Sequence, residues 1–304
     1  MEPFIVHILG CGSALPTLKH NASSQVVEIR EKYFMIDCGE GTQVQLRRSR
    51  LKFTKISAVF ISHLHGDHCF GLIGMISTFG MLGRTAPLHI YAPTGFKHIL
   101  DIQINFFCTG LEYDVICHEI NTEEQTVIYE DRSLTVETIP LVHRVPCCGF
   151  LFKEKPQLPH IIRDVVDFYK VPVSQFNNIK NGADWIDNDG NVIPHSKLTK
   201  PAGAPRSYVY CSDTRYIPDL YEKVKGVNVM YHESTYLSDD EEMAKRYFHS
   251  TAAQAATVAS DASVGTLVLG HYSARYDIEA KLLSEAEKIF TNTILSNEGM
   301  VINV

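Results

Sequence analysis

The segment from Ile61 to Cys69, with the sequence ISHLHGDHC, restricts the fold more than any other part of the chain. It places three histidines and an aspartate within six residues, directly after the apolar run ISAVF, which predicts a strand. Imidazole rings and a carboxylate are poor core residues, because each needs a hydrogen-bond partner once it is desolvated. The pattern therefore favours a metal site at the end of a strand. The candidate ligands are His63, His65, Asp67 and His68.

The spacing of these residues suits two ions rather than one. His63 and His65 are two residues apart, so in extended backbone they project to the same side. Gly66 permits the bend that brings Asp67 and His68 round to a neighbouring position. Later in the chain, further candidates follow predicted strands, although each alone is more often a hydrogen-bonded histidine or a helix-capping aspartate. They are His143 in IPLVHRV, Asp213 in VYCSDTR and His271 in VLGHYSARY.

Read together, these seven side chains form two sets of three nitrogen and oxygen ligands with one shared carboxylate. Imidazole and carboxylate without a thiolate suit Zn²⁺ best, with Mn²⁺ and Fe²⁺ as alternatives. Two zinc ions per subunit, about 3.5 to 4 Å apart, would activate one water, because Zn²⁺ lowers the pKa of bound water to roughly 7. The sequence therefore predicts a nucleophile that exists at neutral pH.

Strand and helix signals alternate through most of the chain. In the first half the predicted helices cover residues 72–81 and 94–107. After residue 206, strands such as SYVYCS and VNVMYH alternate with helices such as AAQAATVASDA. Such alternation implies sheets covered by helices, and its presence in both halves suggests two such layers packed face to face. A length of 304 residues suits one α/β domain with an elaboration.

The elaboration lies between residues 158 and 205, where the alternation breaks. PHIIRDVVDFYKVP predicts one amphipathic helix closed by proline, and WIDNDGNVI predicts a hairpin around an Asp-Gly turn. An insertion of this length in a compact domain is more often functional than not. Residues 151–206 also carry eight Lys and Arg against six Asp and Glu, although the net charge of the chain is −7. The insertion is therefore a candidate binding element.

Composition and the N-terminal sequence restrict the cellular location of the protein. No apolar run approaches the ~18 residues of a membrane span, and the N-terminus MEPFIVHILGCG lacks the basic start and cleavage site of a signal peptide. We therefore expect a cytoplasmic protein that does not enter a membrane. The eight cysteines contain no CxxC pair, which predicts scattered reduced thiols. The net charge of −7 argues against a uniformly basic protein that coats nucleic acid.

The HxHxDH motif, with the later histidine, aspartate and histidine in the same order, resembles the metallo-β-lactamase superfamily over nearly the whole chain. This resemblance implies a four-layer αββα sandwich, a single domain over residues 1–304 with a flexible arm inserted at 153–205. Two further motifs, His232-Glu233-Ser234-Thr235 and His249-Ser250-Thr251, are similar to those of the ribonuclease Z family. That family comprises the endonucleases that remove the 3′ trailer from precursor tRNA.

The resemblance assigns catalytic roles. Phosphodiester hydrolysis requires a nucleophile, charge neutralisation at phosphorus and a proton for the departing oxygen. His249, oriented and kept protonated by Glu233, would supply that proton. Asp67 would bind metal and also accept the proton of the attacking water. The products would be a tRNA with a 3′-hydroxyl and a trailer with a 5′-phosphate, and no cofactor other than the two zinc ions is implied.

Substrate-contacting segments depart from the family pattern. The family arm grips tRNA with a Gly-Pro tip and reaches across a homodimer, whereas Val173 and Ser174 occupy that place here. The segment PTLKHN, residues 16–21, partly matches the PxKxRN loop of members that cleave trailers lacking an encoded CCA. Leu18 and His20 replace its lysine and arginine, so the preference for CCA-containing or CCA-less precursors stays open.

Two other functions are compatible with parts of the pattern. A small-molecule metallo-hydrolase of the same fold, of the thioesterase or lactamase type, would use the metal ligands but leaves the arm and His249 without a task. A non-catalytic RNA-binding module would use the arm but has no need of a complete ligand set. Release of a trailer from precursor tRNA distinguishes the endonuclease from both.

Overall fold

The computed structural model describes residues 2–15 and 17–304, so that Met1 and Pro16, the first residue of the PTLKHN segment, lie outside the described residues. The described chain divides into two compact units. The larger unit consists of Glu2–Lys153 and Arg206–Val304, and the smaller of Glu154–Pro205. Lys153, at which we expect the arm to begin, is part of the larger unit, because it pairs with Ser207 in a neighbouring strand.

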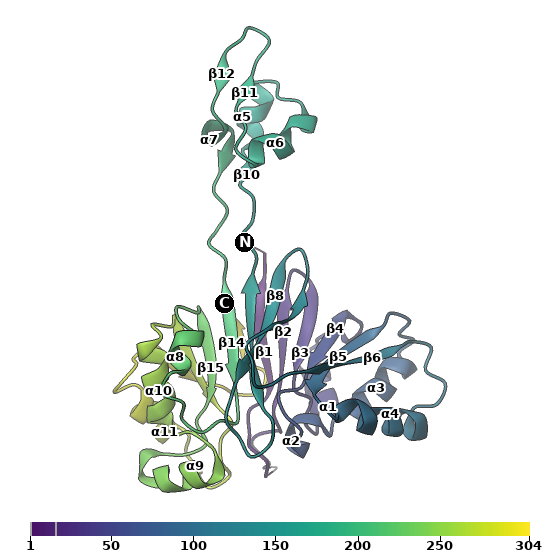
Figure 1. Ribbon diagram of the computed structural model, residues 1–304, viewed down its shortest axis with the longest axis vertical. Helices are drawn as coiled ribbons and strands as arrows, with labels where there is room; N and C mark the ends of the chain where they lie inside the picture. Colours follow the sequence, from purple (N-terminus) through teal and green to yellow (C-terminus); the bar gives the residue numbers. More distant parts are fainter. Residues whose placement is uncertain (1, 16) are drawn as a thin grey trace. The chain divides into compact units, whose positions relative to one another are not determined.

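The larger unit contains two seven-stranded sheets (Figure 1). The order of the first sheet is β18 (Val301–Asn303), β1 (Phe4–Gly10), β2 (Ser24–Ile29), β3 (Lys32–Ile36), β4 (Ile56–Phe60), β5 (Leu88–Pro93) and β6 (Val115–Ile120). The order of the second sheet is β17 (Thr293–Leu295), β16 (Thr266–Gly270), β15 (Val229–Glu233), β14 (Ser207–Cys211), β9 (Cys148–Glu154), β8 (Leu134–Pro140) and β7 (Val127–Glu130). Strands β14 to β17 are parallel, and β9 pairs antiparallel with β14.

The two sheets pack face to face over a shared apolar core. Strand β3 illustrates how its sequence builds this arrangement, since successive side chains of a strand point to opposite faces. Phe34 and Ile36 belong to the core between the sheets, where the ring of Phe34 lies 6.0 Å from that of Phe152 in β9. Tyr33 and Met35 belong to a second core on the outer face. Both faces of the first sheet are thus covered.

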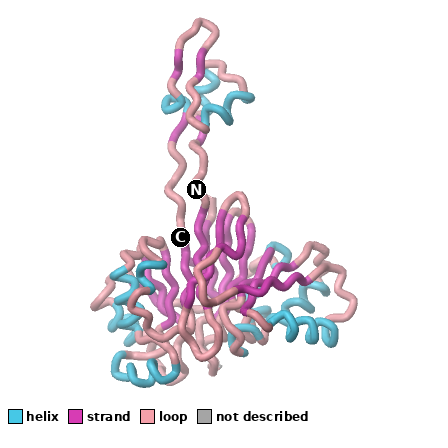
Figure 2. Tube along the Cα trace, viewed as in Figure 1, coloured by secondary structure: helices cyan, strands magenta, loops and turns pink. Residues whose placement is uncertain are grey.

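Helices form the outer layers (Figure 2). Leu46, Phe79 and Leu100, from three different helices, belong to the outer core of the first sheet. Those helices are α1 (Thr42–Arg48), α3 (Leu72–Met81) and α4 (Phe96–Phe107). The second sheet is covered by α8 (Leu220–Lys223), α10 (Ala252–Asp261) and α11 (Ala280–Ala286). This arrangement confirms the predicted αββα sandwich. None of the described helices combines the length and apolarity that a membrane span requires.

Several predicted elements have different boundaries. The helix at residues 72–81 is confirmed as α3, whereas α4 begins at Phe96 because Gly95, with φ of 94°, precedes it in left-handed backbone. The single helix predicted for PHIIRDVVDFYKVP is wrong. This segment forms β10 (His160–Ile161) followed by α5 (Arg163–Phe168). Several elements were not predicted from the sequence, among them α1, β6, β7, β17 and the helix α9 (Glu241–Tyr247).

The smaller unit has its own core, made of Val166, Val171, Ile179, Ile193 and Leu198. Strand β10 pairs with β13 (Thr199–Lys200), and β11 (Trp185–Ile186) pairs with β12 (Val192–Ile193) in a hairpin. Gly190, with φ of 83°, lies in the turn of this hairpin, which agrees with the predicted Asp-Gly turn. The helices α6 (Phe176–Lys180) and α7 (His195–Leu198) complete the unit. Val173 and Ser174 begin a 3-10 turn, Val173–Gln175, and Val173 is 69% exposed.

Candidate metal centre and active site

All seven predicted ligands lie beyond the ends of strands from both sheets. His63 and His65 follow β4, and Asp67 and His68 lie on the short helix α2 (Gly66–Cys69). The remaining ligands follow strands of the second sheet, His143 after β8, Asp213 after β14 and His271 after β16. Because strands from the two sheets end at a common edge, residues far apart in the sequence converge there.

Asp213 and His271 have left-handed backbones, with φ of 53° and 57°. Residues other than glycine adopt this conformation rarely, and where they do it is often at functional sites. Each residue follows a parallel strand, so this local bend turns its side chain out of the strand direction. Both side chains are buried, with exposed fractions of 2% and 1%. The fold therefore holds these two candidate ligands in fixed positions.

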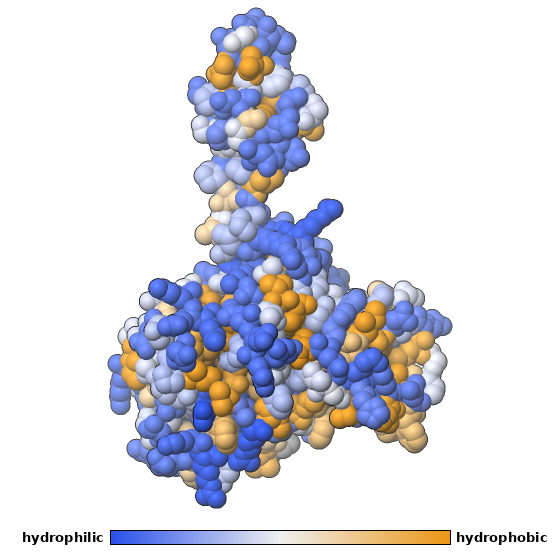
Figure 3. All heavy atoms as spheres, in the orientation of Figure 1, coloured by the Kyte–Doolittle hydropathy of each residue, from blue (hydrophilic) through white to orange (hydrophobic). Residues whose placement is uncertain are grey.

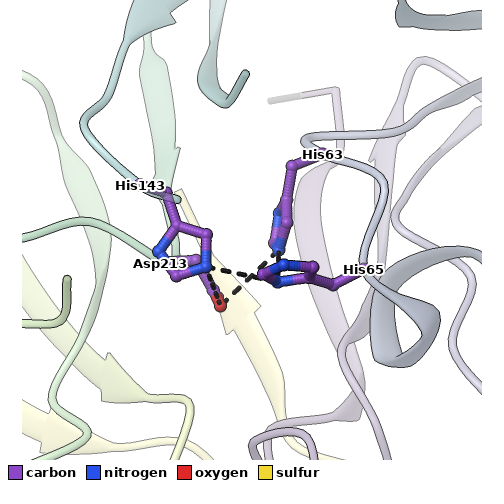
Figure 4. Close-up of side chains that lie close together, drawn as sticks. All are labelled: His63, His65, His143 and Asp213. Atoms are coloured by element: carbon purple, nitrogen blue, oxygen red, sulfur yellow. Dashed lines mark hydrogen bonds and ion pairs between the residues drawn. The ribbon is translucent and has the colours of Figure 1, made fainter. Parts of the chain in front are cut away.

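One group of ligand atoms comes from His63, His65, His143 and Asp213 (Figure 4). Nδ1 of His65 lies 3.1 Å from Nε2 of His63 and 3.2 Å from Nε2 of His143. Oδ2 of Asp213 lies 3.6 Å from Nε2 of His63 and 3.8 Å from Nε2 of His143. Separations of this size are those expected between ligands of one ion with bonds of about 2.0–2.2 Å.

A second group comes from Asp67, His68, His271 and again Asp213. Nε2 of His68 lies 3.3 Å from Oδ2 of Asp67 and 3.3 Å from Oδ1 of Asp213. Nε2 of His271 lies 3.1 Å from the same Oδ1 atom. Asp213 therefore presents one oxygen to each group, which identifies it as the carboxylate that the two groups share.

Two buried nitrogen atoms indicate that a cation fits this site. Nε2 of His68 and Nε2 of His271 lie near carboxylate oxygens of Asp67 and Asp213 but make no hydrogen bond among the described residues. The opposite nitrogen of each ring is occupied, since Nδ1 of His68 donates to Asp37 over 2.7 Å and Nδ1 of His271 donates to the hydroxyl of Thr235 over 2.9 Å. Metal-ligating histidines usually have their second nitrogen fixed in this way. A metal ion would satisfy both otherwise unpaired atoms.

The histidines of the first group are oriented similarly. Nδ1 of His63 donates to the hydroxyl of Ser62 over 3.0 Å, and Nδ1 of His143 donates to the carbonyl of Phe248 over 3.0 Å. Burial, the largest effect at both rings, lowers the pKa of His63 well below its usual value and lowers that of His143. Both rings are therefore neutral at pH 7 and retain a lone pair for a metal.

Asp37 is a supporting residue that was not predicted from the sequence. It is fully buried with φ of 54°, and it follows strand β3 in the segment FMIDCG. Its carboxylate accepts hydrogen bonds from the backbone and hydroxyl groups of Ser62, over 2.8 and 2.9 Å, and from the hydroxyl of Tyr210 over 2.8 Å. Its signal in the sequence is an aspartate directly after an apolar strand. Its contacts with Ser62 and Tyr210, however, depend on tertiary packing.

His249 and Glu233 form a hydrogen-bonded pair beside the second ligand group. Nδ1 of His249 lies 2.8 Å from Oε1 of Glu233, which is fully buried and also accepts from the backbone of Thr214 and the hydroxyl of Thr235. Burial lowers the pKa of His249, but the charge of Glu233 and its hydrogen bond outweigh burial and raise that pKa to about 9. His249 is therefore protonated at neutral pH. Its ring stacks on His271 with centroids 5.3 Å apart.

A cavity of about 310 Å³ opens onto this arrangement. Candidate ligands from both groups line it, together with His249. Residues not predicted from the sequence also line it, among them Ser13, Leu15, Arg144, Tyr236, Tyr247 and Ser273. The cavity thus gives a substrate access to the metal groups and to a protonated imidazole at the same time.

A third cluster resembles a metal site in composition but differs in its hydrogen bonding. Cys11, His20 and Glu298 lie together, and both ring nitrogens of His20 have carboxylate partners. Nδ1 lies 3.0 Å from Glu298 and Nε2 lies 3.1 Å from Glu279. Burial lowers the pKa of His20, but the hydrogen bonds and charges of Glu298 and Glu279 outweigh burial and raise it. This cluster therefore has no unpaired ring nitrogen for an ion.

The chain is similar to known proteins over its full length. Residues 4–157 match the family model described as anti-Pycsar protein Apyc1, and residues 199–272 match that of the beta-lactamase superfamily domain. The chain is 58% identical over 304 residues to a ribonuclease Z of Bacteroides fragilis, covering 100% of both chains. It is also 58% identical over 304 residues to a ribonuclease Z of Bacteroides thetaiotaomicron, covering 100% of this chain and 96% of that protein.

The crystal structure of human tRNase Z, short form, is similar in fold. The TM-score is 0.70 and the sequence identity is 25%, and the alignment covers 98% of each chain. The similarity therefore extends over nearly the full length of both proteins.

Proposed function

We infer that this chain, which belongs to the ribonuclease Z family, is an endoribonuclease that removes the 3′ trailer from precursor tRNA. The observation that carries this function is the 58% identity to a ribonuclease Z across the full length of both chains. Hydrolysis leaves a 3′-hydroxyl on the tRNA and a 5′-phosphate on the trailer. The leaving atom is then the 3′-oxygen of the last retained nucleotide, which needs a proton.

We propose that each subunit binds two zinc ions. His63, His65 and His143 would hold one, Asp67, His68 and His271 would hold the other, and Asp213 would contact both. The unpaired Nε2 atoms of His68 and His271 and the absence of a thiolate from the set support this assignment. When bound, such ions supply Lewis acidity, which activates water and neutralises charge on the phosphate.

We propose that side chains of this protein carry out the two proton transfers of the reaction. Asp67 lines the cavity, and we propose that its carboxylate accepts the proton that the attacking water loses. His249 keeps Nδ1 on Glu233, so its Nε2–H is the group that donates a proton to the leaving 3′-oxygen. Glu233 orients His249 and raises its pKa to about 9, so the proton is present at neutral pH. Proton transfer by a positioned side chain contributes about 10²- to 10⁴-fold to rate.

We assign tRNA binding to the arm, residues 153–205. Support comes from its separate apolar core, which lets it fold as a unit, and from exposed cations such as Lys170, Lys197 and Lys200. Phe168, which is 78% exposed, adds an aromatic surface of the kind on which RNA bases stack. Val173, 69% exposed, would take the contact that a Gly-Pro tip makes in other members.

We also propose that the protein forms a homodimer in the cytoplasm, where precursor tRNA is the substrate. An apolar surface on α3 and α4 supports the dimer (Figure 3). Its side chains are Met81, Ile99, Ile102, Phe106 and Phe107, each between 49% and 78% exposed. Contiguous exposed apolar patches of this kind usually mark protein interfaces.

Trailer release from a precursor tRNA by zinc-loaded protein tests the function. We expect cleavage at the 3′ end of the mature tRNA, and no cleavage by the Asp67→Ala variant. A precursor that stays intact with zinc-loaded wild-type protein would contradict the assignment. Mapping the cut on a CCA-containing and a CCA-less precursor then identifies the preferred substrate.

A further inference from the structure

Arg144 and Tyr247 form a stacked pair at the cavity that the proposed mechanism does not use. The guanidinium carbon of Arg144 lies 5.0 Å from the centre of the Tyr247 ring. Both residues line the cavity together with Asp67 and His249. Arg144 directly follows His143, and Tyr247 is the last residue of α9, two residues before His249. The pair is therefore anchored on both sides to residues of the proposed active site.

The guanidinium of Arg144 is available to a ligand. Within residues 2–15 and 17–304 it makes no ion pair or hydrogen bond, and Arg144 is an exposed residue. Arg84 provides a contrast, because it also lies over aromatic rings but donates to the carbonyls of Ile56, Ala86 and Pro87. The donors of Arg84 are thus bonded within the protein, whereas the contact with the ring of Tyr247 leaves the N–H donors of Arg144 free for a ligand.

The backbone next to Tyr247 has an unusual conformation. Phe248 has φ of 60°, an uncommon conformation for a bulky residue, and its carbonyl accepts the Nδ1–H of His143. The chain therefore turns sharply between Tyr247 and His249. A second guanidinium, that of Arg246, lies 5.6 Å from the same ring. The result is a positively charged aromatic platform beside the candidate metal ligands.

We propose that Arg144 and Tyr247 form a nucleotide subsite, which stacks the base of a ribonucleotide that flanks the cleaved phosphodiester. This inference rests on the proposed function, since it names the part of the RNA that the cavity recognises. Unpaired RNA bases stack on aromatic rings and on guanidinium planes, and such stacking tolerates any base. The donors of Arg144 then face the phosphates of the same strand, which gives binding that depends on a base but not on its identity.

The test combines protein variants with substrates that lack one base. Wild type, Arg144→Ala and Tyr247→Ala are compared on a precursor tRNA and on two precursors with an abasic nucleotide on either side of the cut. The readouts are KM for cleavage and Kd for the same RNAs, measured by fluorescence anisotropy with chelator-treated protein. Arg132→Ala is the matched control, because Arg132 is an exposed arginine in the turn between β7 and β8.

On the intact precursor we expect both variants to raise KM and Kd by roughly 5- to 100-fold, the range associated with loss of one stacked base. On the precursor that lacks the stacked base, KM and Kd of the wild type should rise by the same factor. KM and Kd of the variants should rise by less than about twofold further, because the interaction between coupled partners can be lost only once. Tyr247→Phe should resemble wild type, and Arg132→Ala should not change either constant.

Two outcomes would overturn the subsite. In one, the variants bind and cleave the intact precursor as wild type does. In the other, the variants raise KM and Kd by the same factor on the intact precursor and on both abasic precursors. The pair would then act through its charge or as a structural contact, and not by stacking on a base. Failure of the wild type to cleave any precursor is a different result, because it removes the proposed function itself.

Discussion

The carboxylate of Asp37 lies 2.7 Å from Nδ1 of His68, and both side chains are fully buried. This contact fixes which ring nitrogen of His68 is free to face Asp213 and Asp67. An acid that follows β3 therefore determines the donor properties of a candidate ligand that follows the neighbouring strand β4. The consequences of this relationship, and of others in the site, can be measured.

Replacing Asp37 with Asn should weaken metal binding while leaving the candidate ligands in place. An amide cannot provide the negative charge that makes His68 a stronger donor, and loss of such a partner typically costs 10- to 100-fold in metal affinity. Chelator competition measures the zinc affinity. Tyr210→Phe is the matched control, because it removes one hydrogen bond to Asp37 but keeps the charge. Equal affinities in wild type and Asp37→Asn would exclude this role.

The alkaline limit of cleavage should depend on Glu233. His249 must be protonated to act as an acid, so the rate should fall as pH rises through its pKa of about 9. In Glu233→Gln the charge that raises this pKa is absent, and the alkaline limb should move down toward the ordinary histidine value of about 6.5. Profiles of kcat against pH from 6 to 10 test this shift. An unmoved limb would assign the proton to another group.

Removing the shared carboxylate should affect both ions. Asp213 faces both ligand groups, so Asp213→Asn should reduce bound zinc from two per chain to less than one. His143→Ala should lose one ion only, because His143 belongs to one group. His20→Gln should keep two, because the ring nitrogens of His20 are already paired. Elemental analysis after gel filtration gives the counts, and a third ion in wild type lost with His20 would refute this division.

Replacing the arm by a short turn should separate RNA binding from hydrolysis. Lys153 and Ser207 are paired in the antiparallel strands β9 and β14, so a glycine-containing turn can join these strands after residues 154–205 are removed. We expect loss of precursor tRNA binding with continued hydrolysis of bis(p-nitrophenyl) phosphate. Binding is measured by gel shift at several salt concentrations, since phosphate contacts weaken with salt. Equal loss of both activities would mean that the arm is structural.

Charged residues on the α3–α4 surface should prevent dimer formation. Ile102 and Phe106 are 56% and 77% exposed on α4, so Ile102→Glu with Phe106→Glu removes apolar contacts without opening the core. Light scattering after gel filtration should then give the mass of one chain, about 34.2 kDa, against twice that for wild type. Lys97→Glu, on the same helix but exposed outside this surface, is the control. A dimeric double variant would place the interface elsewhere.

The sequence was sufficient to predict the sandwich and the convergence of the seven candidate ligands. Both depend on local signals, namely strand and helix alternation and polar side chains placed directly after apolar strands. The contacts of Asp37 and Thr235 were not predicted, because they join segments that approach only after the two sheets pack. The Arg144–Tyr247 pair was missed for the same reason, together with α9, which carries Tyr247. The arm helix was too long in the prediction, since β10 takes its first residues into a pairing with β13.

The left-handed backbone at Asp213 and His271 limits which amino acids can stand there before any question of chemistry arises. Asparagine, aspartate and histidine enter this region more readily than other side chains, whereas valine or isoleucine would be strained. Random substitution at Asp213 should therefore yield mostly misfolded protein, and asparagine should be among the few replacements that accumulate normally. Abundance and activity will diverge for Asp213→Asn, so a survey of variants scored by expression alone would take this position for a purely structural one.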